Sequence, residues 1–165
     1  MDGPGGVAQP GRALRSQRRS RGFKSHHLHW PSRSRCEAGA IPHDGRSAPI
    51  ALRFNDAINA RDVAVLEALM TADHRFVDSE GQVTAGLDAS VAAWSGFFET
   101  FPDYRNDLEV ALCEAEIVVL RGRSHCSVAE LDAPALWSAR IEGERVAEWR
   151  VHDDTLGNRR MLGID

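Results

Sequence analysis

The chain has 165 residues and a mass of 18.2 kDa, which is the size of one ordinary domain, with or without a tail. Hydrophobic residues make up 42% of the chain and charged residues 27%, so a packed core is possible. No apolar run approaches the roughly 18 residues that span a bilayer, which argues against an integral membrane protein. Three cysteines, odd in number and widely spaced, favour neither a disulfide framework nor a zinc cluster.

The formal net charge of −4 is unevenly divided along the chain. Residues 1–45 carry eight Arg or Lys against three Asp or Glu, whereas residues 46–165 carry twelve Arg against 21 Asp or Glu. A basic arm on an acidic body is typical of a tail that binds nucleic acid or membrane. The apolar residues of this stretch follow neither a helical nor a strand period, so we predict that residues 1–45 are a disordered tail.

The tail has a second interpretation. It resembles the peptide obtained when a transfer-RNA gene is translated in one reading frame, through residues 6–9, 12–13, 16–17, 21–23, 25 and 27–29. We therefore predict a mis-assigned start, which leaves no reason to expect a nucleic-acid or membrane partner. The histidines at 26, 27 and 29 would then signal a metal only by accident, and the sequence requires no metal or organic cofactor. A nucleic-acid-binding protein acting through this arm remains as an alternative if the tail is native.

Three segments with helical periodicity open the rest of the chain. Ile50, Phe54 and Ala57 form one apolar stripe, and Asp62 can cap a second helix. A short hairpin is predicted around residues 76–84. Asp88 is expected to cap a third helix, which Pro102 stops.

After residue 102 the apolar period changes from 3.6 to 2. Strands are predicted at residues 108–112, 117–128, 135–141 and 145–153, as a four-stranded antiparallel meander. Helices grouped apart from strands indicate the α+β class, with three N-terminal helices covering one face of a curved, cone-like antiparallel sheet. The domain is predicted to span residues 46–165. No apolar stretch of secretory type follows the basic N-terminal residues, and a cytoplasmic location is expected.

The order of these elements and several local strings resemble the SnoaL-like polyketide cyclases and the ketosteroid isomerases of the nuclear transport factor 2 superfamily. The strings are residues 54–62, 66–70, 73–78, 94–102 and 141–149, followed by Asp153, Asp154, Leu162 and Gly163. The resemblance covers about residues 47–165. It implies an apolar conical pocket for a small-molecule ligand, and a homodimer formed through the outer face of the sheet, where Leu120, Leu136 and Val146 are suggestive. Since this fold hosts several reactions and plain binding modules, the resemblance fixes the fold better than the reaction.

Two carboxylates are candidate general bases. Asp78 shares a strand face with Phe76 and is expected to point inward, and by the resemblance it falls where ketosteroid isomerases carry their base. Asp153 ends a strand face that also carries Trp149 and Val151, close to the acid or base of SnoaL-like cyclases. Asp154, one residue further on, remains an alternative, because an assignment can slip by one position.

Histidines and aromatic residues complete the candidate site. His125, on a central strand, is a candidate proton donor or orienting group, whereas His74 is expected in contact with water. Side chains expected to line the pocket are Phe54, Phe76, Trp94, Phe98, Trp137 and Trp149. Core packing is the alternative role for most of them.

One departure from the isomerases matters. Phe54 stands where they place an oxyanion-binding tyrosine, and the only tyrosine of this chain is Tyr104. Loss of such a donor lowers a rate by roughly 10²–10³, so steroid isomerisation is disfavoured. The leading hypothesis is a domain that binds a small, mostly apolar ligand, with isomerase, cyclase or hydrolase chemistry by an Asp. The alternative is a non-catalytic ligand-binding or dimerisation module.

Overall fold

The computed structural model describes residues 45–164 of the chain. The predicted tail, with its histidine cluster, lies outside these residues except for Gly45. The described elements follow one another as α2 (Ser47–Ala60), α3 (Val63–Leu69), β1 (Met70–Val77), β2 (Val83–Ala85), α4 (Leu87–Thr100), β3 (Arg105–Glu114), β4 (Ile117–His125), η1 (Ala129–Leu131), β5 (Ala133–Glu142), β6 (Arg145–Asp153) and α5 (Leu156–Leu162).

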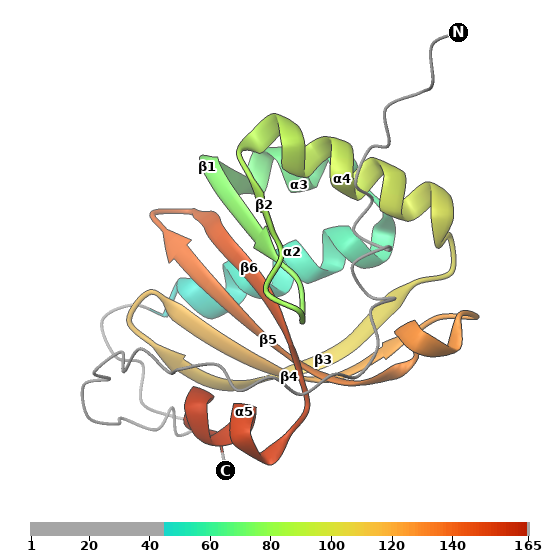
Figure 1. The fold of residues 1–165 in the computed structure, drawn as a ribbon. Helices are drawn as coiled ribbons and strands as arrows, with labels where there is room; N and C mark the ends of the chain where they lie inside the picture. The colour runs from blue at the N-terminus through green and yellow to red at the C-terminus, as the bar shows by residue number, and fades with distance from the viewer. Residues whose placement is uncertain (1–44, 165) are drawn as a thin grey trace, which may run out of the picture.

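The strands form one six-stranded sheet in the order β2-β1-β6-β5-β4-β3 (Figure 1). The predicted meander of β3 to β6 is antiparallel throughout, which confirms that part of the prediction. The predicted hairpin also joins the sheet, with β1 parallel to β6 and Phe76 opposite Trp149. The local pattern did not predict this pairing, because the two strands lie far apart in the sequence.

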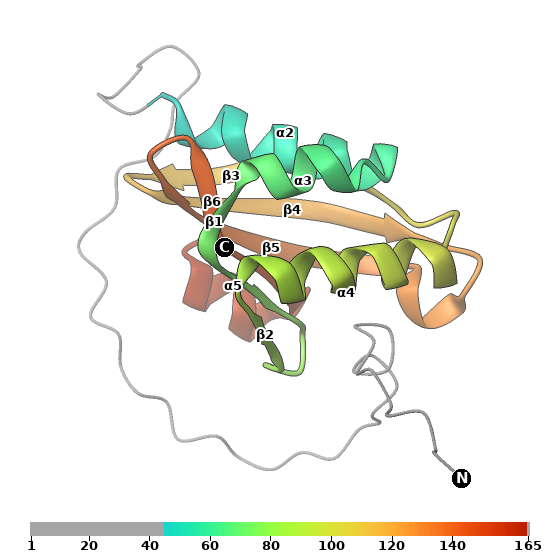
Figure 2. The same ribbon diagram turned by 90° about the horizontal axis from the view of Figure 1, so that it is seen from above.

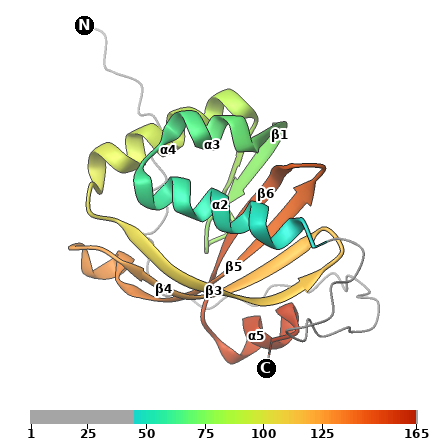
Figure 3. The ribbon, with the colours of Figure 1, turned by 180° about the vertical axis from the view of Figure 1, so that it is seen from behind.

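Helices α2, α3 and α4 lie on the inner face of the curved sheet, and α5 lies on the opposite face (Figures 2 and 3). The main hydrophobic core fills the space between α2, α4 and the inner face. A smaller cluster joins Leu162 of α5 to Val119 and Leu136 on the outer face. The predicted α+β class is therefore confirmed. Within residues 45–164, no helix has the length and apolar character needed to cross a membrane.

Helices α2 and α3 begin and end as their sequences suggest. The α2 stripe of Ile50, Phe54 and Ala57 is buried, and the helix ends at Arg61 in the left-handed conformation with φ of 57°. Asp62 then caps α3 by accepting a hydrogen bond from the Val65 backbone N–H, at 3.1 Å. These two helices place the apolar stripe of α2 against the sheet.

Helix α4 forms the roof over the inner face. It buries Ser90, Trp94, Phe97 and Phe98 and ends just before Pro102, as predicted. The prediction that Asp88 caps it is wrong, because the N-cap is Gly86 and Asp88 lies in the first turn. A glycine is favoured at this position since its φ is 95°, a conformation in which a β-carbon is strained.

Strands β3 and β4 approach each other closely at Gly122. A β-carbon on this residue would lie 2.0 Å from the Asp107 carbonyl oxygen and 2.7 Å from Leu108 Cα. A register shift between Val110 and Leu112 follows in β3. Such bulges bend and twist a strand, so this region contributes to the curvature that makes the inner face concave.

Three sequence-based expectations about individual side chains are wrong. His74 is fully buried, and its Nδ1 lies 2.7 Å from the Val146 carbonyl oxygen. Leu120 lies on the inner face because it pairs with Trp137 of β5. Val146 also lies on the inner face, because the pairing of β5 with β6 shifts register between Arg140 and Ile141 of β5. Of the three residues suggested for a dimer face, only Leu136 lies on the outer face, and α5 packs against it.

Candidate functional site

A cavity of about 100 Å³ lies between the inner face of the sheet and α4. It occupies the end of the sheet where β1, β4 and β6 finish and where β3 and β5 begin. Most of its wall is apolar, with side chains from β1, β5, β6, α4 and η1: Phe76, Trp94, Phe97, Leu131, Ala135, Trp137, Trp149 and Val151. An apolar cavity with few polar groups is the usual form of a small-molecule site.

Strand register explains why these residues share the wall. Side chains two residues apart point to the same face, so Trp149, Val151 and Asp153 follow one another along β6. Trp137 pairs with Val151 and Ala135 pairs with Asp153, which extends the wall across β5. Ala133 and Ala135, whose side chains are small, also line the cavity.

Asp78 lies at the cavity wall directly after β1 and is 6% exposed. Its Oδ1 accepts hydrogen bonds from the backbone N–H groups of Glu80 and Gln82, both at 2.9 Å. The same turn is closed by the backbone bond from Asp78 N–H to the Gln82 carbonyl, at 3.1 Å. The hairpin therefore fixes one carboxylate oxygen, and Oδ2 is the atom left for a ligand.

Asp153 lines the mouth of the same cavity, but it is an exposed residue. Its backbone carbonyl accepts hydrogen bonds from Thr155 N–H and Asn158 Nδ2, both at 2.8 Å, at the start of α5. Asp154 is instead engaged by Arg159 through two hydrogen bonds of 2.5 and 2.7 Å. These bonds lower the pKa of Asp154. Asp154, the alternative candidate base, therefore forms a surface ion pair with Arg159 away from the cavity.

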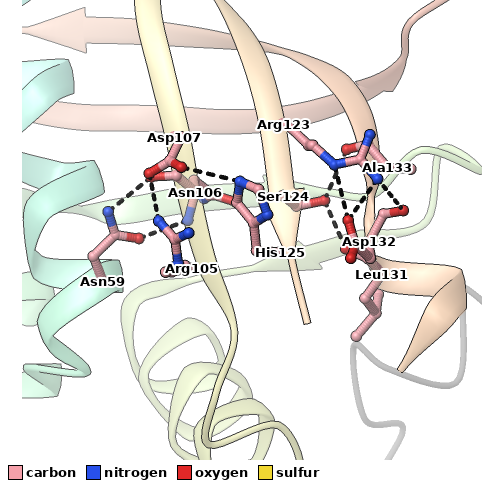
Figure 4. A network of polar contacts seen from close by, with 10 residues as sticks. All are labelled: Asn59, Arg105, Asn106, Asp107, Arg123, Ser124, His125, Leu131, Asp132 and Ala133. Carbon is pink, nitrogen blue, oxygen red and sulfur yellow. Dashed lines mark hydrogen bonds and ion pairs between the residues drawn. The ribbon is translucent and has the colours of Figure 1, made fainter. Parts of the chain in front are cut away.

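His125 is not among the residues that line the cavity. It follows Ser124 on β4, and because successive side chains alternate, Ser124 faces the cavity while His125 faces the outer side. Its Nε2 lies 3.0 Å from Asp107 Oδ2, a contact drawn in Figure 4. The structure thus brings Asp78 and Asp153 to one cavity and leaves His125 outside it.

The six aromatic candidates fall into two groups. Phe76, Trp94, Trp137 and Trp149 line the cavity. Phe54 and Phe98 lie behind the lining, where Phe54 packs against Trp149 with ring centroids 5.0 Å apart and Phe98 stacks on Trp94 at 5.5 Å. These two rings support the wall from the core.

Sequence reasoning missed a polar group on the β3 side of the cavity, made by Tyr104, Asn106 and Ser124. Burial raises the pKa of the Tyr104 hydroxyl, and side-chain hydrogen bonds with Asn106 and Ser124 oppose that rise. The net effect keeps Tyr104 protonated, so it remains a hydrogen-bond donor. Its 8% exposure shows that it belongs to the interior.

Hydrogen bonds to neighbouring elements hold Asn106 and Ser124 in place (Figure 4). Asn106 N–H donates to Asn59 Oδ1 at 2.8 Å, and Asn59 Nδ2 donates to the Asn106 carbonyl at 2.9 Å. Ser124 Oγ donates to the Leu131 carbonyl at 2.7 Å, which ties β4 to η1. The alternation of Asn106 with Leu108 and Val110 was a signal that Asn106 faces inward. Tyr104 follows a turn, where periodicity gives no such signal.

Metal binding has no support in the described part of the chain. Residues 45–164 contain no group of three or more His, Cys, Asp or Glu side chains placed to hold a metal ion. The polar groups of the lining residues are hydroxyls, indoles, an amide and carboxylates, which can bind an oxygenated organic molecule.

Comparisons with known proteins agree with this geometry. The model of the SnoaL-like domain family matches residues 51–155. None of the curated proteins compared with the chain matches it. Among solved structures, a proposed SnoaL-like polyketide cyclase from Shewanella putrefaciens CN-32 is 18% identical, with a TM-score of 0.59 over 77% of this chain and 90% of that chain.

Two further structures have the same fold. A proposed SnoaL-like polyketide cyclase from Jannaschia sp. CCS1 is 21% identical, with a TM-score of 0.56 over 72% of this chain and 91% of that chain. A proposed ketosteroid isomerase from Kribbella flavida DSM 17836 is 13% identical, with a TM-score of 0.55 over 65% and 76%. The match of the family model over most of the described residues, together with this shared fold, shows that the chain belongs to the SnoaL-like domain family.

Proposed function

We propose that the chain binds a small, mostly apolar ligand in the cavity and that Asp78 transfers a proton on it. The observation that carries the proposal is the position of Asp78, a carboxylate buried in an apolar wall with one oxygen fixed by the hairpin. A general base needs such a fixed position within reach of the carbon that it deprotonates. Membership of the SnoaL-like family supports ligand binding with isomerase, cyclase or hydrolase chemistry.

The reaction class is proton abstraction from a carbon next to a carbonyl group. Asp78 Oδ2 takes the proton, and the electron pair of the broken C–H bond forms the C=C bond of an enolate as the carbonyl π electrons move to oxygen. Returning the proton to the same carbon or to a conjugated one completes exchange or isomerisation. Tyr104 lines the same cavity, and its buried hydroxyl, held protonated, can donate a hydrogen bond to a polar group of the ligand.

The test is deuterium exchange at the α-carbons of cyclic ketones such as cyclohexanone, followed by NMR in D₂O. Asp78→Asn keeps an oxygen that accepts the two turn hydrogen bonds but removes the base, so exchange should fall by about 100-fold or more. Asp56→Asn, an exposed change on α2, is the matched control and should leave the rate unchanged. An Asp78→Asn protein that keeps the wild-type rate would contradict the role of Asp78.

Asp153 is the second candidate base, since it lines the mouth of the same cavity. Its exposure places it better for a ligand group that projects into solvent than for the buried carbon. The same deuterium exchange measured with Asp153→Asn distinguishes the two candidate bases. Loss of exchange in this variant, and not in Asp78→Asn, would identify Asp153 as the general base.

A non-catalytic binding module is the second candidate function. Asp78 accepts hydrogen bonds from two backbone N–H groups, so a structural role in the hairpin also explains why its carboxylate is buried. A module of this kind would bind cyclic ketones without exchanging their α-protons. The homodimer and the cytoplasmic location expected from the sequence stay predictions, and sedimentation velocity of the full chain would test the first.

A further inference from the structure

Three polar atoms in the wall of the cavity have no hydrogen-bond partner among residues 45–164. They are Ser90 Oγ, Trp94 Nε1 and Asn106 Oδ1, on side chains that are 0%, 7% and 2% exposed. All three residues line the one cavity. Buried polar groups are almost always satisfied, so three unsatisfied ones around a single space call for an explanation.

Ser90 differs from the other hydroxyl residues of α4. Ser95 Oγ donates to the Val91 carbonyl at 2.9 Å, and Thr100 Oγ1 donates to the Gly96 carbonyl at 2.8 Å, each four residues back along the helix. This is the usual bond of a serine or threonine inside a helix. The Ser90 side chain does not make it, although the Gly86 carbonyl lies four residues back and accepts the Ser90 N–H at 3.0 Å. Its hydroxyl is therefore not used within the helix, and Ser90 is among the residues that line the cavity.

The Trp94 ring is held by aromatic neighbours on several sides. Phe98 stacks on it at 5.5 Å, and Phe76 and Phe97 meet it edge to face at 5.4 and 5.8 Å. Because these contacts fix the ring, its N–H cannot turn away to find another acceptor without disturbing the core. An indole N–H is a donor only, so its partner has to be an acceptor.

The other polar atoms of Asn106 all make hydrogen bonds. Its Nδ2 donates to Asn55 Oδ1 at 3.2 Å, and its backbone N–H and carbonyl both bond to Asn59. The remaining atom, Oδ1, can only accept. The partner that it lacks is therefore a donor.

The charges of the lining residues and the volume of the cavity limit the class of ligand further. Three carboxylates, Asp78, Glu130 and Asp153, are among the lining residues, and no Lys, Arg or His is. This set disfavours an anion. A cavity of about 100 Å³ is somewhat smaller than the roughly 150 Å³ cavity known to hold benzene, so it suits a single ring whose substituents extend toward the mouth.

We propose that the cavity binds a neutral, single-ring compound carrying both a carbonyl group and a hydroxyl group. The carbonyl oxygen accepts from Trp94 Nε1–H and the Ser90 hydroxyl, and the ligand hydroxyl donates to Asn106 Oδ1. This assignment rests on the proposed ligand-binding function and names the substrate class for it. It does not depend on Asp78 acting as a base.

The test measures binding of four probes to the full chain: methylcyclohexane, cyclohexanone, the hydroxycyclohexanone isomers and cyclohexylammonium. Trp94→Phe and Ser90→Ala should each weaken cyclohexanone binding about fivefold to tenfold, as expected for loss of one buried hydrogen bond, and leave methylcyclohexane binding unchanged. Ser95→Ala is the matched control, because its hydroxyl is already bonded within the helix, and it should change neither affinity.

Two further readouts separate the groups. Trp94→Phe identifies the indole N–H resonance of Trp94 in the ¹⁵N spectrum, because that resonance is absent from the variant. In the wild-type protein, this resonance should move downfield when cyclohexanone is added and should not move when methylcyclohexane is added. At least one hydroxycyclohexanone isomer should bind as tightly as cyclohexanone, although its hydroxyl group loses more hydration on binding than the hydrogen atom that it replaces. If every isomer binds tenfold more weakly, the contact with Asn106 is refuted without any variant of that residue.

The remaining outcomes are distinct. Equal effects of Trp94→Phe and Ser90→Ala on ketone and hydrocarbon would overturn the carbonyl subsite while leaving ligand binding intact. Tighter binding of cyclohexylammonium than of the ketones would overturn the neutral class. No binding of any probe would overturn this inference and the proposed function together.

Discussion

Acidification should destabilise the protein through His152. This histidine lies on the outer face of β6, is 8% exposed, and has Nε2 3.0 Å from Ser138 Oγ. Burial, and then the positive charge of Arg150, lower its pKa from 6.5 to about 4, while Glu148 opposes the change. The folded protein therefore keeps His152 neutral at a pH where the unfolded chain already binds a proton.

The sign and size of the effect follow from this difference. The free energy of unfolding is unaffected by His152 above pH 6.5 and falls as the pH drops from 6.5 toward 4, because only the unfolded state gains a proton there. One pKa unit corresponds to about 1.4 kcal/mol, so the loss between these limits is about 3 kcal/mol. A domain of this size has a total stability of roughly 5–15 kcal/mol, so the loss is a large share.

Urea unfolding of the wild type and of His152→Gln between pH 7.5 and 4 measures the effect. The glutamine amide can keep the contact with Ser138 but does not titrate, so the variant should lose about 3 kcal/mol less on acidification. Taking the difference between the two proteins cancels the titration of the carboxylates and of His74, whose pKa is also lowered by burial. Parallel pH curves for the two proteins would show that His152 does not contribute to the loss of stability on acidification.

Three further substitutions test the fold. Gly122→Ala should destabilise the protein by about 3 kcal/mol or more, because the new β-carbon meets the β3 backbone, whereas Gly96→Ala, with open space at that position of α4, should stabilise it by about 0.5–1 kcal/mol. Thermal unfolding of both variants checks this, and similar melting temperatures would contradict the close approach. Asp62→Ala should remove the α3 cap and lower the free energy of unfolding by about 1 kcal/mol in urea titration; an unchanged value would show that the cap contributes nothing.

Local periodicity predicted much of the fold. The apolar stripe of α2, the cap at Asp62 and the strand over residues 145–153 all follow from side chains close in sequence. The pairing of β1 with β6 did not, because it joins segments more than 70 residues apart. Helix α5 was missed since its seven residues carry too short an apolar pattern, and His74 was misplaced because a corner position does not reveal which element covers it.

The candidate site was predictable only where a strand face could be read. Asp78, Trp137 and Trp149 were placed by alternation with apolar neighbours, and the structure brings them to one cavity. Tyr104 follows a turn and lies at the cavity against Phe97 of α4, with ring centroids 4.8 Å apart, a contact that no local pattern encodes. Ser90 lies on a helix whose buried face was recognised by its large residues, so its small hydroxyl gave no signal.

A crystal structure of the full chain with a bound hydroxycyclohexanone would show where the ring lies relative to Trp94 and Asp78. We expect the ring to lie between Trp94 and Trp137, with its carbonyl oxygen accepting a hydrogen bond from Trp94 Nε1–H and a carbon beside that carbonyl facing Asp78 Oδ2. A ligand bound outside the cavity, or one inside it with Asp78 turned away from the ring, would contradict this expectation.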